Sequence, residues 1–392
     1  VDASVAVGFA LAVTLPRAGN LGGGGFLLIY DKESDEISAI DYRSAAPSSA
    51  TSDLFLEKDK VIRFGHLVNA VPGSVAGLLK AHKDHGSLPL DDLLKPAISL
   101  AKDGFEVTHD LNYVLEWGKE SMLANQVSKD KFYDLNEAPL QVRSILKQPN
   151  LAKTLFKISK KGSEIFYKGE IAKWISEQSL SSGGLITMED MAAYKAKLRE
   201  PIETSYRGYR VVTMPPAASG GLVLLQTLNI LENFDLKELG HNSAKTVHLL
   251  SESMQRAYAD RAAYHGDPDY YEVPIKQMLN RQYSRDLADQ ISETRTPNGQ
   301  IFAGDLRKYD ESPDTTHFSI IDSKGNAVSN TYTLGSSFGS GVTIEKGGFL
   351  MNNQMRNFSH FYGREDVKFG TSEANKLEPG KRMISTQTPT LV

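Results

Sequence analysis

The chain has 392 residues, of which 40% are hydrophobic and 23% are charged, as in a globular protein with a large core or two lobes. The formal net charge of −4 argues against a nucleic-acid partner. There is no cysteine, which excludes disulfides, thiolate metal sites and a cysteine nucleophile, and no apolar run reaches the length of a membrane span. The chain starts inside a helical pattern without an initiator Met and ends in an unfinished apolar strand, so we expect truncation at both ends.

The first elements predicted are a helix, a glycine run and two strands. Residues 3–14 are small and apolar on almost every face, which predicts a buried helix. Four glycines at 22–25 lead into predicted strands at 26–30 and 37–42. The glycines indicate close backbone approach. A phosphate-binding loop is the alternative, but such loops run from strand to glycines to helix, and the order here is helix, glycines, strand.

Arg43 follows the second strand and precedes Pro47. Its guanidinium could hold a carboxylate through two parallel hydrogen bonds. Taken alone, the residue fits a surface ion pair better. Both interpretations stay open at this point of the sequence.

The middle of the chain is mainly helical. Thr187 and Asp190 fit a capping box before a short helix, and strands are predicted on either side of a turn at 206–209. Polar composition predicts a surface loop at 128–137, and a long polar loop at 359–375 has the length of a lid. A further strand is expected at 347–353. The predicted helices cover residues 74–83, 90–103, 151–161, 222–233 and 241–263.

A β-hairpin is predicted for residues 316–321 and 327–334, with its turn at 323–326. If Lys324 and Gly325 form the centre of the loop, Thr316 faces Thr333. A threonine at the start of a strand suits an N-terminal-nucleophile enzyme, in which chain cleavage frees an α-amine as the base for the hydroxyl. On the hairpin alone, an ordinary surface hairpin is the better interpretation.

The sequence contains no candidate metal site. No set of His, Asp and Glu has the spacing of metal ligands. His248 and His265 lack spacing partners, and His248 lies on a predicted helix as a structural histidine would.

Several motifs together resemble the γ-glutamyltranspeptidase family, in the same order and over essentially the whole chain. No single motif is specific for this family, but the occurrence of all six motifs in this order is. The motifs are NLGGGGF at 20–26, DYRSAAP at 41–47, MPPAASGG at 214–221, TTHFS at 315–319, NNQMRNF at 352–358 and KRMISTQTPT at 381–390.

The resemblance implies a fold and a maturation step. The fold is an α+β, four-layer αββα N-terminal-nucleophile hydrolase sandwich. The precursor would cleave itself between Asp314 and Thr315, so that residues 1–314 belong to the large subunit and 315–392 begin the small, catalytic one. Thr315 would be the nucleophile, and Thr333 would support its amine and hydroxyl. The oxyanion donors of the family lie downstream of Val392, and the reaction needs no metal or other cofactor.

The resemblance also assigns the substrate contacts. Arg43, Ser385 and Thr386 would hold the α-carboxylate of a γ-glutamyl group, and Gln354 and Asn357 would hold its α-amine. The family usually has Asp at the position of Asn357. Gly335 stands where an Asn that contacts the substrate is common. Asn357 predicts a weaker preference for the α-amine, and Gly335 removes one polar contact to the substrate. Together they predict a less strict preference for γ-glutamyl groups.

The function expected from the resemblance is transfer of the γ-glutamyl group of glutathione-like amides to water or an amine. One alternative is a glutaryl or cephalosporin-type acylase. Another is a relative that never matures and only binds a glutamate-like ligand, and nucleotide binding is the most distant. The expected partners are the small-molecule substrate, the acceptor and the two fragments of the precursor. The family's usual export predicts a periplasmic or secreted protein.

Overall fold

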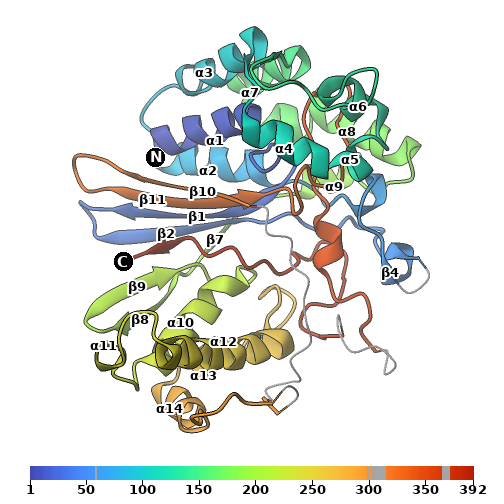
Figure 1. Cartoon of the computed structure of the whole chain (residues 1–392). Coiled ribbons are helices and arrows are strands. Elements are labelled where there is room, and N and C mark those ends of the chain that lie inside the picture. Colours follow the sequence, from blue (N-terminus) through green and yellow to red (C-terminus); the bar gives the residue numbers. More distant parts are fainter. Residues whose placement is uncertain (58–59, 298–299, 302–314, 364–370) are drawn as a thin grey trace. The chain divides into compact units, whose positions relative to one another are not determined.

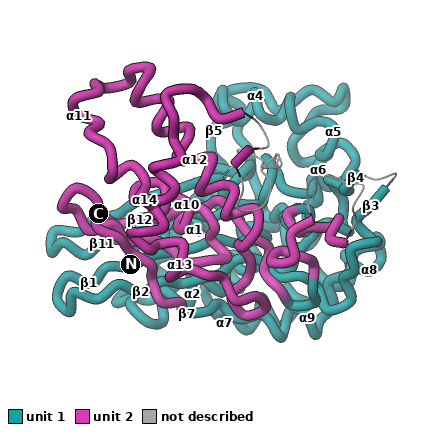
Figure 2. The backbone as a smooth tube through the Cα atoms, turned by 90° about the horizontal axis from the view of Figure 1, so that it is seen from below, with its two compact units in different colours: residues 1–198, 311–356, 378–380 teal, residues 199–310, 357–377, 381–392 magenta. Residues whose placement is uncertain are grey.

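The computed structural model describes residues 1–57, 60–297, 300–301, 315–363 and 371–392. The chain divides into two compact units, coloured separately in Figure 2. Unit 1 comprises residues 1–198, 311–356 and 378–380, and unit 2 comprises residues 199–310, 357–377 and 381–392. Asp314 and part of the predicted lid at 359–375 lie outside the described residues. The units reflect packing and do not test the predicted subunit boundary between residues 314 and 315.

Unit 1 is built around a five-stranded sheet with the strand order β10-β11-β1-β2-β7 (Figure 1). β1 lies between β11 and β2 and is antiparallel to both. The six residues Gly24–Ile29 of β1 are all buried. Successive side chains point to opposite faces of a strand, so this stretch is covered on both faces. The strands are β1 (Gly24–Asp31), β2 (Glu36–Tyr42), β7 (Lys197–Arg199), β10 (Thr316–Ile321) and β11 (Ala327–Thr333).

Two layers of helices pack on one face of this sheet (Figure 1). α1 (Asp2–Thr14) and α2 (Ser74–His85) lie next to the strands, and α3 (Leu90–Asp103) and α7 (Pro149–Tyr167) pack behind them. α1 is apolar nearly all round, as predicted, because it is enclosed between the sheet and α3. The predicted bounds of α3 are confirmed at both ends.

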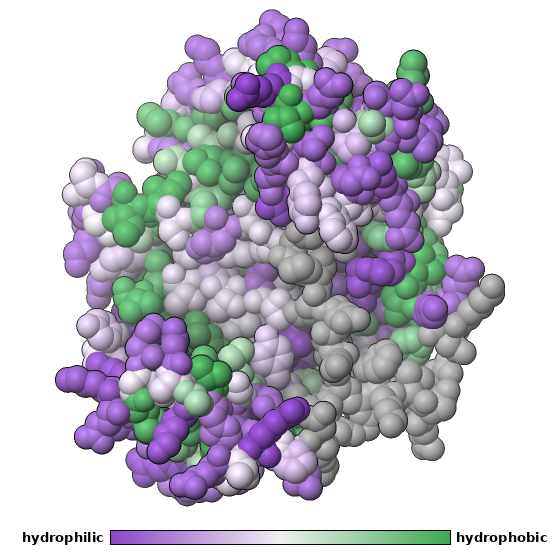
Figure 3. All heavy atoms as spheres, in the orientation of Figure 1, coloured by the Kyte–Doolittle hydropathy of each residue, from purple (hydrophilic) through white to green (hydrophobic). Residues whose placement is uncertain are grey.

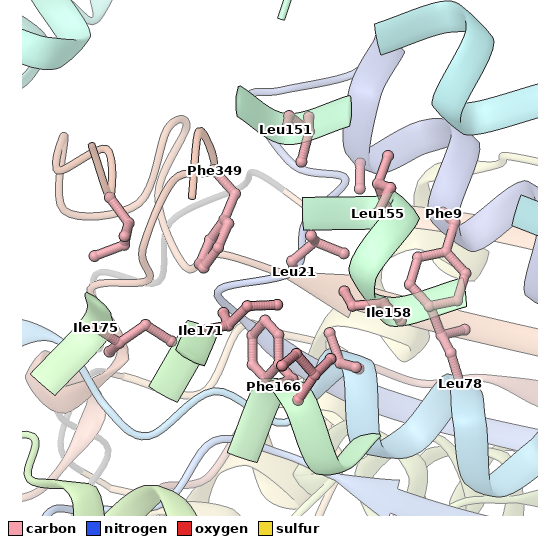
Figure 4. Close-up of a cluster of buried hydrophobic side chains, with 14 of the residues drawn as sticks. Phe9, Leu21, Leu78, Leu151, Leu155, Ile158, Phe166, Ile171, Ile175 and Phe349 are labelled. Atoms are coloured by element: carbon pink, nitrogen blue, oxygen red, sulfur yellow. The ribbon is translucent and has the colours of Figure 1, made fainter. Parts of the chain in front are cut away.

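The main core of unit 1 lies between these helices (Figure 4). Phe9 of α1, Leu78 of α2 and Ile158 of α7 are fully buried in it. Each such side chain contributes roughly 1.5–3 kcal/mol by leaving water. Phe166 and Phe349 meet at a ring-centroid distance of 5.7 Å and connect α7 to the segment after the hairpin. The core therefore holds α7 against the segment that follows the hairpin.

Shorter elements complete unit 1. The capping box is confirmed, because Thr187 Oγ1 accepts from Asp190 N and the Asp190 carboxylate accepts from Thr187 N. The remaining helices are α4 (His109–Trp117), α5 (Lys119–Met122), α6 (Gln126–Phe132), α8 (Glu170–Ser181) and α9 (Met188–Ala193), with short 3₁₀ turns at Ser52–Phe55, His66–Val68 and Gln354–Asn357. The remaining strands are β3 (Leu56–Glu57), β4 (Lys60–Val61), β5 (Phe105–Glu106) and β6 (Ile145–Leu146).

Unit 2 is a three-stranded sheet with the order β12-β9-β8, covered by α10. α12, α13 and α14 pack against α10 on the side away from the strands (Figure 1). The predicted strand pair around the turn at 206–209 is confirmed. The elements are β8 (Ile202–Tyr206), β9 (Tyr209–Thr213), α10 (Ser219–Leu231), α11 (Leu236–Leu239), α12 (Ala244–Tyr264), α13 (Ile275–Met278), α14 (Arg281–Asp289) and β12 (Thr390–Leu391).

The hairpin of β10 and β11 forms where it is predicted, but its register is shifted by one residue. Thr316 pairs with Tyr332 and not with Thr333. The cause is the turn, in which the Asp322 side chain accepts hydrogen bonds from Lys324 N and Asn326 N. Gly325 takes a φ of +89°, as a three-residue hairpin loop requires. The loop is therefore centred on Lys324.

Two further predictions are wrong. The polar segment 128–137 does not form a surface loop throughout, because α6 runs to Phe132. Asn125 Oδ1 caps the helix at Ser128 N, and Phe132 is fully buried. Residues 347–353 do not form a strand. Gly348 has a φ of +72°, and the segment makes only isolated bridges, at Leu350 and Met351.

The surface is mixed in polarity. On the face shown in Figure 3, hydrophilic residues cover much of the outer helices, and hydrophobic residues lie in smaller groups between them. Across the described parts of the chain, no helix has the length and apolar character that a membrane span requires.

A buried histidine in unit 2 predicts sensitivity to acid. His265 is fully buried, and burial together with nearby Arg261 lowers its pKa to about 3. The unfolded chain, with a pKa near 6.5, therefore binds this proton more readily, and the free energy of unfolding falls as the pH drops from 6.5 toward 3. At pH 4 the loss amounts to about 3 kcal/mol. Urea unfolding at pH 7 and pH 4 should show this loss in the wild type and a smaller loss in His265→Gln. Equal losses of unfolding free energy in both proteins would show that His265 does not cause the sensitivity to acid.

Candidate active site

Thr315 and Thr333 lie at the open end of the hairpin. β10 begins one residue after Thr315, and the observed register pairs Thr316 with Tyr332. Continued by one residue, this register sets Thr315 opposite Thr333. Thr315 is exposed, whereas Thr333 is buried at the end of β11. The shift in register thus brings together the two threonines that the resemblance implicates.

The backbone of Thr333 is held from two sides. Gln354 Nε2 donates to Thr333 O at 2.8 Å. A Cβ at Gly23 would lie 2.1 Å from the same oxygen, so only glycine allows β1 to approach it. The Thr333 hydroxyl accepts from Gly335 N at 3.0 Å. Gly335 itself has a φ of +107°, and a Cβ there would lie 2.2 Å from Asn353 Oδ1. The glycine run thus serves close packing, as predicted.

The amide of Gln354 presents an unused acceptor. The residue is fully buried, and its Oε1 has no hydrogen-bond partner among the residues that the structure describes. Because Nε2 is bound to Thr333 O, the orientation of the amide is fixed. Leaving a buried acceptor unpaired costs roughly 1–3 kcal/mol. A ligand that carries an ammonium group would satisfy it.

Asn352, beside Gln354, is a positioning residue that the sequence reasoning missed. Its Nδ2 donates to Gly22 O at 2.7 Å and to Ala70 O at 2.8 Å. Its Oδ1 accepts from Ala70 N and from Gln354 N. One side chain therefore ties the glycine run to the turn that carries Gln354. Its presence in the NNQMRNF motif was the only signal.

Arg43 is buried, with 1% of its surface exposed, so the interpretation as a surface ion pair is wrong. It follows directly after β2. Its N–H donates to Asp41 Oδ1 at 3.0 Å, and its carbonyl accepts from Tyr194 OH at 2.8 Å. The main chain on both sides of this arginine is therefore fixed. A buried, always-charged guanidinium is suited to a carboxylate ligand.

The other predicted substrate contacts belong to unit 2. Ser385 is buried, and Thr386 and Asn357 are partly exposed. Asn375, which the sequence reasoning also missed, connects the two segments: its Nδ2 donates to Asn357 O at 2.7 Å, and its Oδ1 accepts from Ile384 N at 3.1 Å. Within unit 2, Asn375 therefore links Asn357, predicted to bind the amine, to the segment of Ser385 and Thr386, predicted to bind the carboxylate.

The hairpin supplies no separate base for Thr315. His317 lies two residues further along the strand, and burial lowers its pKa. Both of its ring nitrogens are in hydrogen-bond contact, Nδ1 with Thr331 Oγ1 at 2.7 Å and Nε2 with Ser319 Oγ at 3.0 Å. In the described part of the chain, no group of His, Asp and Glu could hold a metal ion. Cleavage before Thr315 would free an α-amine next to its hydroxyl.

Comparison with known proteins decides the family. The model of the family described as gamma-glutamyltranspeptidase matches residues 1–392. The chain belongs to the γ-glutamyltranspeptidase family. It is 46% identical to the glutathione hydrolase proenzyme of Escherichia coli K12 over 401 residues, which cover 100% of this chain and 68% of that protein.

Solved structures of related proteins confirm the fold. The γ-glutamyltranspeptidase of Helicobacter pylori matches with a TM-score of 0.75 and 40% identity, over 79% of this chain and 90% of that one. The cephalosporin acylase of Bacillus halodurans matches with a TM-score of 0.84 and 29% identity, over 99% of this chain and 69% of that one. The predicted α+β, N-terminal-nucleophile hydrolase fold is therefore confirmed.

Proposed function

We propose that the protein is a γ-glutamyl hydrolase and transferase that cleaves itself before Thr315 and then acts on glutathione-like amides. The observation that carries this proposal is the hairpin register, which pairs Thr316 with Tyr332 and, continued by one residue, would set Thr315 opposite Thr333. The name of the Escherichia coli relative, a glutathione hydrolase proenzyme, supports both the reaction and the processing step.

The proposed reaction is acyl transfer through a covalent intermediate. The Thr315 hydroxyl attacks the γ-carbonyl, while the α-amine of Thr315 takes the hydroxyl proton and later gives it to the leaving amine. Water or an acceptor amine then attacks the ester, which releases the glutamyl group and restores the hydroxyl. Fixed N–H donors must stabilise the oxyanion in both steps.

The proposed substrate contacts use both charged ends of the glutamyl group. Arg43, Ser385 and Thr386 would bind the α-carboxylate, and Gln354 and Asn357 would bind the α-amine. The unpartnered Oε1 of Gln354 supports the second assignment, because an ammonium can donate to it. Hydrolysis of γ-glutamyl p-nitroanilide, with release of glutamate, tests the function. A protein that is cleaved before Thr315 but leaves the anilide unhydrolysed would contradict the proposed function.

A broader acyl specificity is also proposed, because Asn357 offers a neutral contact where a carboxylate would make a charge-assisted one. We expect Asn357→Asp to raise the preference for γ-glutamyl over glutaryl p-nitroanilide by roughly tenfold in kcat/KM. Asn242→Asp, at an exposed turn of unit 2, is the matched control and should keep the wild-type ratio. A wild-type preference above roughly a thousandfold, about 4 kcal/mol, would argue against broad specificity.

We also propose that the two fragments stay together after cleavage. The family resemblance further supports export of the protein to the periplasm or the cell exterior.

A further inference from the structure

The MPPAASGG motif at 214–221 is prominent in the sequence, yet none of its residues has a place in the reaction. In unit 2 it connects β9 to α10, and its backbone runs beside Ser385. Ala218 and Ser385 form a parallel β-bridge. Ser385 N donates to Ala217 O at 3.0 Å, and Ser219 N donates to Ser385 O at 2.7 Å. The motif is thus docked on the segment that carries the predicted carboxylate-binding pair.

The hydroxyl of Ser219 adds a second bond to the same oxygen. Ser219 is fully buried, and its Oγ donates to Ser385 O at 2.9 Å. The Oγ also accepts from Nε of Arg261, a buried residue of α12, at 2.7 Å. Because a guanidinium can only donate, it directs the hydroxyl proton of Ser219 toward Ser385 O. The bond from the charged guanidinium also strengthens the chain of contacts.

Gly220 brings the motif against the next residue of the pair. A Cβ at Gly220 would lie 2.2 Å from Thr386 O and 2.1 Å from Thr388 Oγ1. Any side chain there would therefore displace the backbone of Thr386. Ser219 and Gly220 thus define where Ser385 and Thr386 lie.

We propose that Ser219, held by Arg261, is the positioning residue that fixes the Ser385-Thr386 pair for the α-carboxylate of the substrate. This inference rests on the proposed function, which assigns that carboxylate to the pair. Ser219 acts through the backbone of Ser385, so its loss should weaken recognition of the carboxylate and leave recognition of the amine intact.

Three anilides separate these effects. γ-Glutamyl and glutaryl p-nitroanilide both carry the carboxylate, whereas 4-aminobutyryl p-nitroanilide keeps the amine and lacks the carboxylate. We expect Ser219→Ala to lower kcat/KM for the first two by roughly 10- to 100-fold, mainly through KM, because small misplacements of binding groups are costly. The change for the third should stay below about threefold.

Ser253→Ala is the matched control, since Ser253 is a fully buried serine of α12 whose Oγ has no hydrogen-bond partner in the described structure. It should leave all three substrates near wild-type values. If Ser219→Ala does not fold, Gly220→Ala tests the same displacement from the Thr386 side and should show the same selectivity.

Two results would overturn the inference: equal losses on all three anilides, or no loss on the carboxylate-bearing pair. Failure of the proposed function is seen separately, in the wild type. A wild-type enzyme that does not prefer the carboxylate-bearing anilides would have no carboxylate site for Ser219 to position, and both proposals would fall.

Discussion

Replacing Thr315 by alanine is expected to abolish both cleavage of the chain and hydrolysis of γ-glutamyl p-nitroanilide. The hydroxyl is the proposed nucleophile in both reactions, and without cleavage no α-amine is freed to act as its base. Because nucleophile and base are lost together, we expect kcat to fall by more than roughly 10⁴-fold. A denaturing gel measures the cleavage, and release of p-nitroaniline measures the turnover.

Thr316→Ala is the control for this experiment. It removes the same atoms from the adjacent threonine, which starts β10 and pairs with Tyr332. We expect cleavage to proceed and kcat to stay within about threefold of the wild type, because no step of the proposed reaction uses this hydroxyl. A cleaved, active Thr315→Ala protein, or loss of activity in Thr316→Ala alone, would show that the nucleophile is misassigned.

The second large effect is expected at Arg43. Arg43→Met removes a buried guanidinium and with it the two charge-assisted hydrogen bonds proposed to the α-carboxylate. The expected loss is about 3–4 kcal/mol, or roughly 10²- to 10³-fold in kcat/KM for γ-glutamyl p-nitroanilide, most of it in KM. Arg43→Lys should recover part of the loss, since an ammonium keeps the charge but not the fork of two donors.

Arg17→Met is the matched control, because Arg17 pairs with a half-exposed Asp110 near the surface of unit 1. It should leave kcat/KM unchanged. The 4-aminobutyryl anilide provides the second comparison, since it has no carboxylate for Arg43 to bind. If Arg43→Met reduces activity equally on this anilide and on the γ-glutamyl one, Arg43 supports the fold and does not recognise the carboxylate.

Much of the fold follows from local sequence signals. The bounds of α3, the capping box of Thr187 and Asp190, and the strands of the hairpin could all be predicted, because each depends on neighbouring residues. The hairpin register could not be predicted, because it depends on which backbone groups the Asp322 side chain caps. Helix α6 was missed since its sequence is polar except for one buried face.

Less of the candidate active site could be predicted from the sequence. Neither Thr315 nor Arg43 could be assigned from local sequence alone: the hairpin fits an ordinary surface hairpin, and Arg43 fits a surface ion pair. Both assignments needed the resemblance, because the burial of Arg43 comes from distant segments. Asn352, Asn375 and Ser219 were missed altogether. Asn352 and Ser219 bond to backbone atoms that lie 282 and 166 residues away in the sequence. Asn375 bonds to backbone atoms 18 and 9 residues away, across the loop that it joins. A local pattern reveals neither kind of partner.

The central claim is that Thr315 becomes an N-terminal nucleophile, and one measurement tests it directly. The purified protein is separated on a denaturing gel, and the N-terminal residue of the smaller fragment is determined by sequencing and by intact mass. The account predicts two fragments, with Thr315 as the first residue of the smaller one. A single intact chain with full activity, or a fragment that begins at Thr316 or elsewhere, would contradict it.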